Sequence, residues 1–340
     1  EKYNPRGRSL EQLKLDIECE IFEWHLIDRG TWKDHDAWQV DGVDQIWGNV
    51  DVKFIKTWYN IPCNKMVYLL KQRELTNAFI FCEWNERPQR LLTPGDTVKV
   101  FFGCENVQPD FNDCHAAISQ KYIDQENHFR LPLWTQYVNW FGTRPMVSNR
   151  DQCYLIDPNS LLEKRFDPDS LLKQKVNFCN FLYTQPRGLR MTFLDYFRGY
   201  KKIDSAGKLH NNMGGTVQGR SDHIFKILWQ ESYKFTASLE NDLDPGWTTE
   251  KLLHPMSTLS LPIYWGNERV ADEFNTESFI NIHDFDSVET AVEYVKEVDN
   301  NQDLYLDIMS RPWFKNREFP EHIKPAAVLE FLEKTLEAGR

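Results

Sequence analysis

The chain has 340 residues, of which 41% are hydrophobic, and its formal net charge is −11. This length predicts about two domains, and the hydrophobic content is sufficient for a large buried core. The negative charge argues against nucleic acid or an anionic membrane as the partner, because both require a positive field on the protein.

The sequence carries no signal for a membrane span or for export. It has no run of about 18 or more apolar residues, and its first residues, EKYNPRGRSLEQLKLD, lack the apolar segment of a signal peptide. The seven cysteines are widely spaced without a C-x-x-C pair, and no N-x-S/T sequon is present. Thiols of this kind are typical of a reducing compartment, so we expect a cytoplasmic protein without a transmembrane segment. The oligomeric state, a peripheral membrane contact and an anchor ahead of Glu1 stay open.

Helical and strand patterns alternate in the first half of the chain. Residues 9–28 are predicted to be helical, because Ser9 and Gln12 form a capping-box pattern ahead of apolar residues that recur on one face. Strands are predicted at 52–56, 78–82 and 97–102. The polar, Asp- and Pro-bearing residues 148–170 are interpreted as a connection between domains.

The second half of the chain continues this alternation. We predict strands at 178–183, 233–239, 261–265 and 278–283, and helices at 225–229, 287–298 and 326–336. Strands that alternate with helices are the signature of an α/β fold.

The segment after the predicted strand 233–239 holds the strongest candidate site. Thr248 is placed to cap a helix that opens with Thr249-Glu250-Lys251, and the free N–H groups at a helix start attract anions. A lysine in the first turn is unfavourable for the helix itself, and a bound diphosphate would explain it. Glu250 suits the vicinal hydroxyls of a ribose, and Trp247 offers a face for stacking. A capped helix with a solvated Glu-Lys pair is the alternative, and the residue types alone do not decide between the two.

A longer run around this site resembles a known family. Residues 234–285, KFTASLENDLDPGWTTEKLLHPMSTLSLPIYWGNERVADEFNTESFINIHDF, resemble the donor-binding half of the α1,3-fucosyltransferases of glycosyltransferase family 10. The family pattern is roughly K-F-x-x-x-x-E-N, an aromatic residue, x-T-E-K, an apolar run to P-I-x-x-G, and S-F-I. The chain matches it at Lys234-Phe235, Glu240-Asn241, Trp247, Thr249-Glu250-Lys251, Pro262-Ile263, Gly266 and Ser278-Phe279-Ile280. It looks most similar to bacterial members.

The resemblance extends to a segment that bears an arginine. Residues 181–195 resemble the family's strand, loop and arginine-bearing helix, which implies that Arg190 neutralises the donor diphosphate and that Thr184 contacts the donor. Arg187 is the local competitor for that role, since the length of this loop varies in the family.

The resemblance also covers a segment of the first half. Residues 101–112, FFGCENVQPDFN, resemble the family segment G-E-N-x-x-P-x-F-N, whose glutamate is the proposed catalytic base and corresponds to Glu105. Two positions depart from the family. Cys104 stands where the family has Gly, and Trp247 stands where it usually has Tyr.

The resemblance implies a GT-B architecture with two Rossmann-like domains facing across a cleft. Residues 1–50 would be an N-terminal extension, 51–155 the acceptor-side domain, 156–310 the domain that binds GDP-L-fucose, and 311–340 a closing helix. The implied reaction is inverting transfer of L-fucose from GDP-L-fucose to the 3-OH, alternatively the 4-OH, of N-acetylglucosamine in a lactosamine-type glycan, such as a Lewis antigen of bacterial lipopolysaccharide.

The implied site has one base and a cationic donor pocket. Glu105 would deprotonate the acceptor, and Arg190, Lys251 and helix N–H groups would stabilise the leaving diphosphate without a metal. The implied donor contacts are Thr184, Arg190, Asn241, Trp247, Glu250 and Lys251.

The tripeptide Asp284-Phe285-Asp286 matches the D-x-D metal motif of another glycosyltransferase fold. Asp286 and Glu289 also form a capping-box pattern, which we favour, so we predict neither a metal nor a cofactor beyond the donor substrate. Three alternatives to fucose transfer stay open: a transferase of the same fold with another nucleotide sugar, a hydrolase with paired carboxylates, and a catalytically silent sugar-binding protein.

Overall fold

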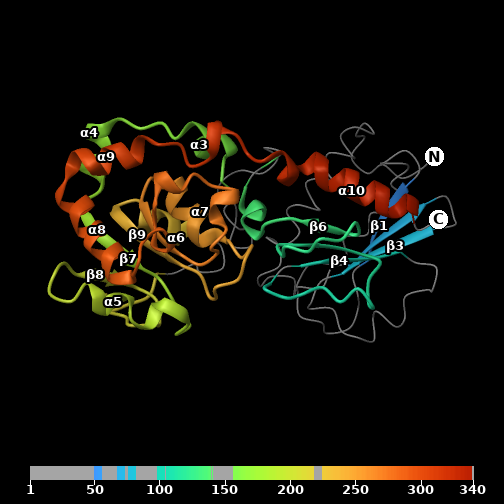
Figure 1. Ribbon diagram of the computed structural model, residues 1–340, viewed down its shortest axis with the longest axis horizontal. Coiled ribbons are helices and arrows are strands. Elements are labelled where there is room, and N and C mark those ends of the chain that lie inside the picture. Colours follow the sequence, from blue (N-terminus) through green and yellow to red (C-terminus); the bar gives the residue numbers. More distant parts are fainter. Residues whose placement is uncertain are drawn as a thin grey trace. The chain divides into compact units, whose positions relative to one another are not determined.

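The computed structural model describes residues 50–55, 67–72 and 76–81 by their backbone, and residues 98–103, 105–138, 140, 156–217 and 224–338 more fully. The chain forms two compact units (Figure 1). Unit 1 comprises residues 1–136, 140–143 and 321–340, and unit 2 comprises residues 137–139 and 144–320. We expected residues 311–340 to form a closing helix after the second domain; residues 311–320 belong to unit 2 and residues 321–340 to unit 1. The predicted helix at 9–28 and Cys104 lie outside the described residues.

Unit 1 is built on a mixed sheet. Its described strands lie side by side in chain order: β1 (Val50–Ile55), β2 (Val67–Gln72), β3 (Thr76–Phe81), β4 (Val98–Phe102), β5 (Ala116–Ser119) and β6 (His128–Arg130). The pairs β1–β2 and β2–β3 are antiparallel, whereas β3 to β6 run parallel. The predicted strands at 52–56, 78–82 and 97–102 are confirmed as β1, β3 and β4. The strands β2, β5 and β6 were not predicted; β5 and β6 are too short to show a periodicity.

Helix α10 (Pro325–Ala338) packs against this sheet. The rings of Phe331 in α10 and Phe129 in β6 lie with their centroids 5.4 Å apart, and Figure 1 shows the helix beside β6. The predicted helix at 326–336 is confirmed. The helix lies within residues 321–340, which belong to unit 1 together with residues 1–136.

Unit 2 is built on a parallel sheet in which the chain order reverses. Its strands are β7 (Asn177–Phe181), β8 (Ile203–Ser205), β9 (Tyr233–Leu239), β10 (Leu261–Trp265) and β11 (Ile280–Asn281). They lie in the order β11-β10-β9-β7-β8, so the reversal falls between β7 and β9. In open α/β sheets, ligands bind at such a point, outside the carboxyl ends of the strands. The topology therefore predicts that the residues that follow β7 and β9 form a ligand-binding site.

The predictions for the strands of unit 2 differ in their outcome. The strands predicted at 233–239 and 261–265 are confirmed with the same bounds as β9 and β10, and 178–183 is confirmed as β7. The strand predicted at 278–283 is mostly wrong, because only β11 is extended. It lies between two 3₁₀ turns, η4 (Thr276–Ser278) and η5 (Ile282–Asp284).

Helices cover the sheet of unit 2. They are α3 (Pro158–Glu163), α4 (Pro168–Gln174), α5 (Phe193–Tyr196), α6 (Ile224–Gln230), α7 (Glu250–Ser257), α8 (Val288–Asn300) and α9 (Gln302–Ser310). The predicted helices at 225–229 and 287–298 are confirmed as α6 and α8. None of the helices in the described parts of either unit is both long and apolar enough to cross a bilayer.

We interpreted residues 148–170 as a connection between domains; their described part, residues 156–170, belongs to unit 2, where it forms α3 and opens α4. Each helix begins with an Asp-Pro pair: the side chains of Asp157 and Asp167 accept hydrogen bonds from the backbone N–H groups of Asn159 and Ser170, and Pro158 and Pro168 follow at the first helical position. Aspartate caps and proline at this position favour helix starts, so these Asp and Pro residues open helices here.

Candidate functional site

The carboxyl end of β9 receives a buried arginine. The backbone carbonyl of Leu239, the last residue of β9, accepts hydrogen bonds from Arg190 Nε at 3.2 Å and Nη2 at 2.6 Å. Arg190 is 2% exposed, and its guanidinium lies 4.1 Å from the centroid of the Tyr183 ring. The structure thus holds Arg190 in place from two directions, a fixed position suited to an anion-binding cation.

A glycine brings the arginine close to the sheet. Arg190 belongs to the 3₁₀ helix η2 (Gly188–Met191), in which Gly188 has φ +52°. A Cβ on Gly188 would lie 2.5 Å from the ring of Trp265 at the end of β10, which is closer than side chains approach. Only glycine combines this dihedral angle with this contact.

Tyr183, two residues after β7, joins the two central strands. Its hydroxyl donates to the carbonyl of Ala237 at 2.7 Å and accepts from the N–H of Leu239 at 2.6 Å. Burial raises the pKa of this hydroxyl, so it stays neutral at physiological pH. Thr184, a predicted donor contact, follows directly and is half-buried.

The residue after Leu239 is a buried carboxylate. Glu240 accepts hydrogen bonds from the N–H and the hydroxyl of Thr249, each at 2.8 Å, and its Oε2 lies 3.2 Å from Lys251 Nζ. Burial lowers the pKa of Lys251, but the charges of Glu240 and Glu250 outweigh it and the net shift is upward, so the ammonium stays charged. Arg190 and Lys251 therefore converge on consecutive residues, Leu239 and Glu240.

The loop between β9 and α7 closes with a tight turn. Asp244 to Trp247 form a type II pattern, with Pro245 second, Gly246 third at φ +92°, and the Trp247 N–H bonded to the Asp244 carbonyl at 3.0 Å. Buried Asn267 fixes this loop: its Oδ1 accepts from the Gly246 N–H at 2.9 Å, and its Nδ2 donates to the Thr248 hydroxyl at 3.0 Å. Asn267 was not among the predicted site residues.

The prediction that Thr248 caps the helix is wrong by one residue. Thr249 is the N-cap of α7, and its hydroxyl accepts from the Lys251 N–H. Thr248 does not cap because its hydroxyl is held by Asn267. Lys251 remains in the first turn, as expected from the sequence.

The other predicted donor contacts lie on the same loop and helix start. Asn241 and Glu250 are half-buried, and Glu250 Oε1 lies 3.5 Å from Lys251 Nζ. Trp247 is only 3% exposed, so its ring offers no open stacking face in this structure. Its buried indole N–H has no hydrogen-bond partner among the described residues. Its contact with a nucleotide stays a prediction.

Lys226 is a further cation that the sequence reasoning missed. It lies on α6, which packs against α7 and β9 (Figure 1). Burial lowers the pKa of Lys226 to about 8, and the charges of Glu250, Lys251, Glu240 and Arg190 also act on it. No motif contains this lysine, so no local sequence pattern indicates it.

The comparisons with known proteins match both halves of the chain. Residues 173–326 match the family described as Glycosyltransferase family 10 (fucosyltransferase) C-term, and residues 52–137 match the Alpha-(1,3)-fucosyltransferase FucT N-terminal domain. Together the two matches cover more than half of the chain. The chain belongs to glycosyltransferase family 10.

This family 10 protein spans only part of the length of the curated relatives that it matches. The Alpha-(1,3)-fucosyltransferase FucT of Helicobacter pylori is 26% identical over 284 residues, which cover 77% of this chain and 58% of the relative. The putative fucosyltransferase R654 of Acanthamoeba polyphaga mimivirus is 32% identical over 46% of this chain and 27% of the relative. GDP-fucose protein O-fucosyltransferase 3 of Xenopus laevis is 27% identical over 54% of this chain and 38% of the relative.

Solved structures confirm the predicted fold class. A crystal structure of an α1,3-fucosyltransferase aligns with a TM-score of 0.60 and 24% identity, and the alignment covers 78% of this chain and 79% of that one. A crystal structure of an α1,3-fucosyltransferase with GDP-fucose aligns with a TM-score of 0.56 over 72% of this chain and 76% of that one. The family 10 protein thus has the α/β fold of the GT-B class.

Glu105, the predicted base, lies in unit 1 after β4. It is half-buried, and its backbone carbonyl accepts hydrogen bonds from the Gln120 side-chain amide at 2.8 Å and from the Val107 N–H at 2.7 Å. Lys121 Nζ donates to Asn106 Oδ1 at 2.5 Å. Gln120 and Lys121 follow β5, so the carboxyl end of β5 holds the loop that carries Glu105.

The D-x-D tripeptide of this family 10 protein has local roles. Asp284 Oδ1 accepts from the Asn281 side-chain amide at 2.8 Å. The predicted cap at Asp286 is wrong by one residue, because Ser287 caps α8 and accepts from the Thr290 N–H. Across the described parts of both units, His, Cys, Asp and Glu side chains form no group of three or more that could hold a metal ion.

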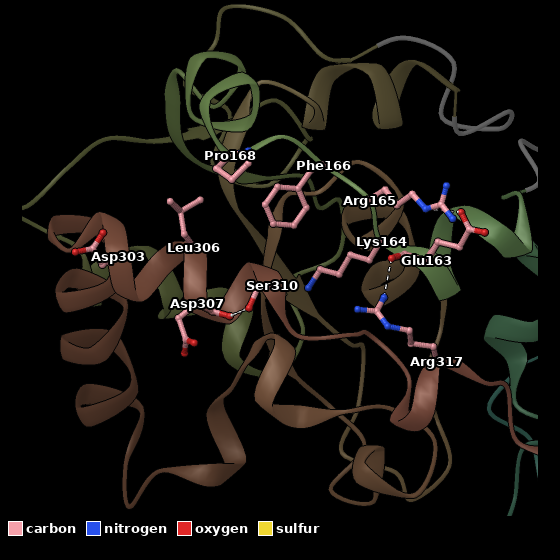
Figure 2. Close-up of a pocket in the computed structure, with 10 residues that line it drawn as sticks. All are labelled: Glu163, Lys164, Arg165, Phe166, Pro168, Asp303, Leu306, Asp307, Ser310 and Arg317. Atoms are coloured by element: carbon pink, nitrogen blue, oxygen red, sulfur yellow. Dashed lines mark hydrogen bonds and ion pairs between the residues drawn. The ribbon is translucent and has the colours of Figure 1, made fainter.

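A pocket of about 640 Å³ lies elsewhere in unit 2, between α3, α4, α9 and the turn at Arg317 (Figure 2). The cations at its wall are bound by their neighbours. Lys164 Nζ donates to the Arg311 carbonyl at 2.6 Å, Arg317 Nη1 donates to the Glu163 carbonyl at 2.7 Å, and Arg165 Nε lies 3.1 Å from Glu163 Oε2. These cations are thus engaged within the protein, and none of the predicted site residues lines the pocket.

Proposed function

We propose that this family 10 protein transfers L-fucose from GDP-L-fucose to an acceptor hydroxyl with inversion at the anomeric carbon. The observation that carries the proposal is the convergence of Arg190 and Lys251 on Leu239 and Glu240, at the carboxyl end of β9 and beside the reversal of strand order. Fixed cations at this point suit a diphosphate. The similar α1,3-fucosyltransferase solved with GDP-fucose supports fucose as the sugar.

In the proposed reaction, Glu105 accepts the proton of the acceptor hydroxyl as that oxygen attacks the anomeric carbon. The new carbon–oxygen bond forms on one face of the sugar, and the bond to the β-phosphate oxygen breaks on the other. The electron pair leaves with GDP, whose growing negative charge Arg190, Lys251 and the N-terminal N–H groups of α7 stabilise. The electrostatic work falls to protein groups, so we expect activity to survive chelation of divalent metals.

For the acceptor, we propose the 3-OH, alternatively the 4-OH, of N-acetylglucosamine in a lactosamine-type glycan, as on lipopolysaccharide, and we propose a cytoplasmic location. The Helicobacter pylori relative is an α-(1,3)-fucosyltransferase by name, which supports transfer to a 3-OH. A second acceptor class, a protein hydroxyl, is favoured by the likeness to protein O-fucosyltransferase 3.

The test is a transfer assay with GDP-fucose, with and without EDTA, on type 1 and type 2 disaccharides and on folded proteins that carry Ser and Thr. We expect a fucosylated disaccharide and stoichiometric GDP. Thermal shifts with GDP-fucose, UDP-sugars and other GDP-sugars check the donor. Transfer from another nucleotide sugar, hydrolysis of free glycosides without GDP release, or binding without turnover would each replace this proposal by the corresponding alternative.

A further inference from the structure

Lys226 differs from the other cations of the candidate site in its partners. Lys251 Nζ lies 3.2 Å from Glu240 and 3.5 Å from Glu250, and the Arg190 guanidinium bonds to the Leu239 carbonyl. Lys226 is half-buried on α6, and no hydrogen bond or ion pair joins its ammonium to any residue that the structure describes. The helix α6 that carries it packs against α7 and β9, and the charges of Glu250, Lys251, Glu240 and Arg190 act on the lysine.

The net charge of the candidate site determines how well it can bind a diphosphate. Burial raises the pKa of Glu240, whereas the charge of Lys251 and the hydrogen bonds from Thr249 lower it. With Glu240 ionised beside Lys251, the two cations Arg190 and Lys251 are matched by the two carboxylates of Glu240 and Glu250, so these four groups present no net charge to a ligand. The diphosphate of a nucleotide sugar carries about two negative charges and gains another as the sugar leaves, and buried anions need paired cations. Lys226 supplies the positive charge that the other four groups lack.

We propose that Lys226 is a third cationic contact for the diphosphate of the donor, and that it takes up a proton when the diphosphate binds. The proposal rests on the proposed function only in requiring a nucleoside diphosphate at this site. It does not depend on the base, on the sugar or on the acceptor.

The proton uptake follows from the surroundings of Lys226. In the ligand-free protein, burial lowers its pKa to about 8; Glu250 and Glu240 raise it, whereas Lys251 and Arg190 lower it further. A diphosphate beside the ammonium favours the charged form and raises the pKa. Between pH 7.5 and 8.5, a growing fraction of the free protein carries neutral Lys226, so binding draws a proton from solution and the affinity falls as the pH rises.

The test is calorimetric titration of the full chain with GDP at about pH 7.5, 8.0 and 8.5, in two buffers of different ionisation enthalpy. We expect the wild type to take up a fraction of a proton that grows with pH. Lys226→Met should bind GDP about tenfold more weakly without that uptake, the loss expected for one desolvated charge contact. Lys226→Arg, which stays protonated, should bind GDP tightly without uptake. Lys173→Met, an exposed lysine on α4, is the matched control and should behave as the wild type.

The outcomes separate this inference from the proposed function. Wild-type affinity in Lys226→Met, or proton uptake that persists in Lys226→Arg, overturns the role of Lys226 and leaves fucose transfer standing. UDP, ADP and inorganic pyrophosphate are titrated in parallel. If UDP binds and GDP does not, with the same effects of the Lys226 variants, the inference holds and GDP-fucose as donor is wrong. If none of the four ligands binds, both are wrong.

Discussion

Glu240 and Gly266 lie so close that a Cβ on Gly266 would stand 2.5 Å from Glu240 Cγ and 2.9 Å from the Tyr264 hydroxyl oxygen. Gly266 follows β10, and its missing side chain makes room for the Glu240 carboxylate, which is held in turn by Thr249 and Lys251. Gly266, the glycine of the P-I-x-x-G pattern, therefore helps to fix the position of Lys251 through Glu240.

Gly266→Ala should destabilise unit 2 and weaken nucleotide binding together. The added methyl group must displace the buried Glu240 side chain, and overpacking of this kind costs about 1–3 kcal/mol. Thermal denaturation and GDP titration check both effects. Gly215→Ala is the matched control, because its Cβ would meet no atom within 4 Å. Equal stability and affinity of the two variants would contradict the coupling of Gly266 to Lys251.

Much of unit 2 could be predicted from the sequence. The apolar segments of β9 and β10 are bounded by polar residues, so the sequence predicts their ends correctly. The motif residues Arg190, Glu240 and Lys251 also meet at one strand end, as predicted. Lys226 and Asn267 could not be found in this way. Their roles depend on how α6 and the segment after β10 pack, which no local pattern specifies.

The caps show a different limit of sequence reasoning. Thr248 and Thr249 are equally good caps by residue type, and the choice between them is made by a hydrogen bond from distant Asn267. In the same way, Ser287 and not Asp286 caps α8. Residue preferences thus predict that a helix begins nearby, whereas tertiary contacts fix the residue at which it begins.

Lys251→Ala should raise the KM for GDP-fucose about tenfold or more and lower kcat, since the lysine would contact the diphosphate in both the ground state and the transition state. It should also destabilise the protein by about 3–5 kcal/mol, because Glu240 is left buried without its counter-charge. The double variant Glu240→Gln with Lys251→Ala should recover much of that stability but none of the activity. Steady-state kinetics and thermal denaturation separate the two effects. Unchanged kinetics in Lys251→Ala would remove the lysine from the site.

Glu105→Gln should lose turnover and keep GDP binding. An amide cannot accept the acceptor proton, and loss of a general base typically costs about 10²–10⁴ in rate. Transfer rates and GDP titration are the measurements, with Glu126→Gln, an exposed glutamate of the same unit, as the control. Full activity of Glu105→Gln would show that another group is the base.

Gln120→Ala should lower kcat about tenfold without changing the KM for the donor. Gln120 is fully buried, and its Nε2 holds the Glu105 carbonyl at 2.8 Å, so its loss loosens the loop that carries the proposed base. The donor residues belong to unit 2 and keep their positions. Exposed Gln108 lies on the same loop, and Gln108→Ala provides the comparison in the same kinetic assay. A raised KM for GDP-fucose with unchanged kcat would contradict a role confined to the Glu105 loop.

His128→Gln should reduce the loss of stability of the protein in mild acid. Burial lowers the pKa of His128 to about 4, and Arg130 adds to this, whereas a backbone hydrogen bond to Ile123 opposes it. Above pH 6.5 the imidazole is neutral in the folded and the unfolded chain. As the pH falls toward 4, the unfolded chain is protonated first, so the stability that His128 contributes is lost.

Glutamine does not titrate and can keep the hydrogen bond to the Ser119 hydroxyl, which lies 2.9 Å from His128 Nε2. Denaturant unfolding at pH 7, 6, 5 and 4.5 checks the prediction. Between pH 7 and pH 4.5, we expect the free energy of unfolding to fall by about 1 kcal/mol less in the variant than in the wild type, because solvent screening at this half-buried position reduces the full effect of the pKa shift. His115→Gln, at an exposed position of the same unit, should follow the wild type. If His128→Gln also follows the wild type, then His128 is protonated as readily in the folded protein as in the unfolded chain.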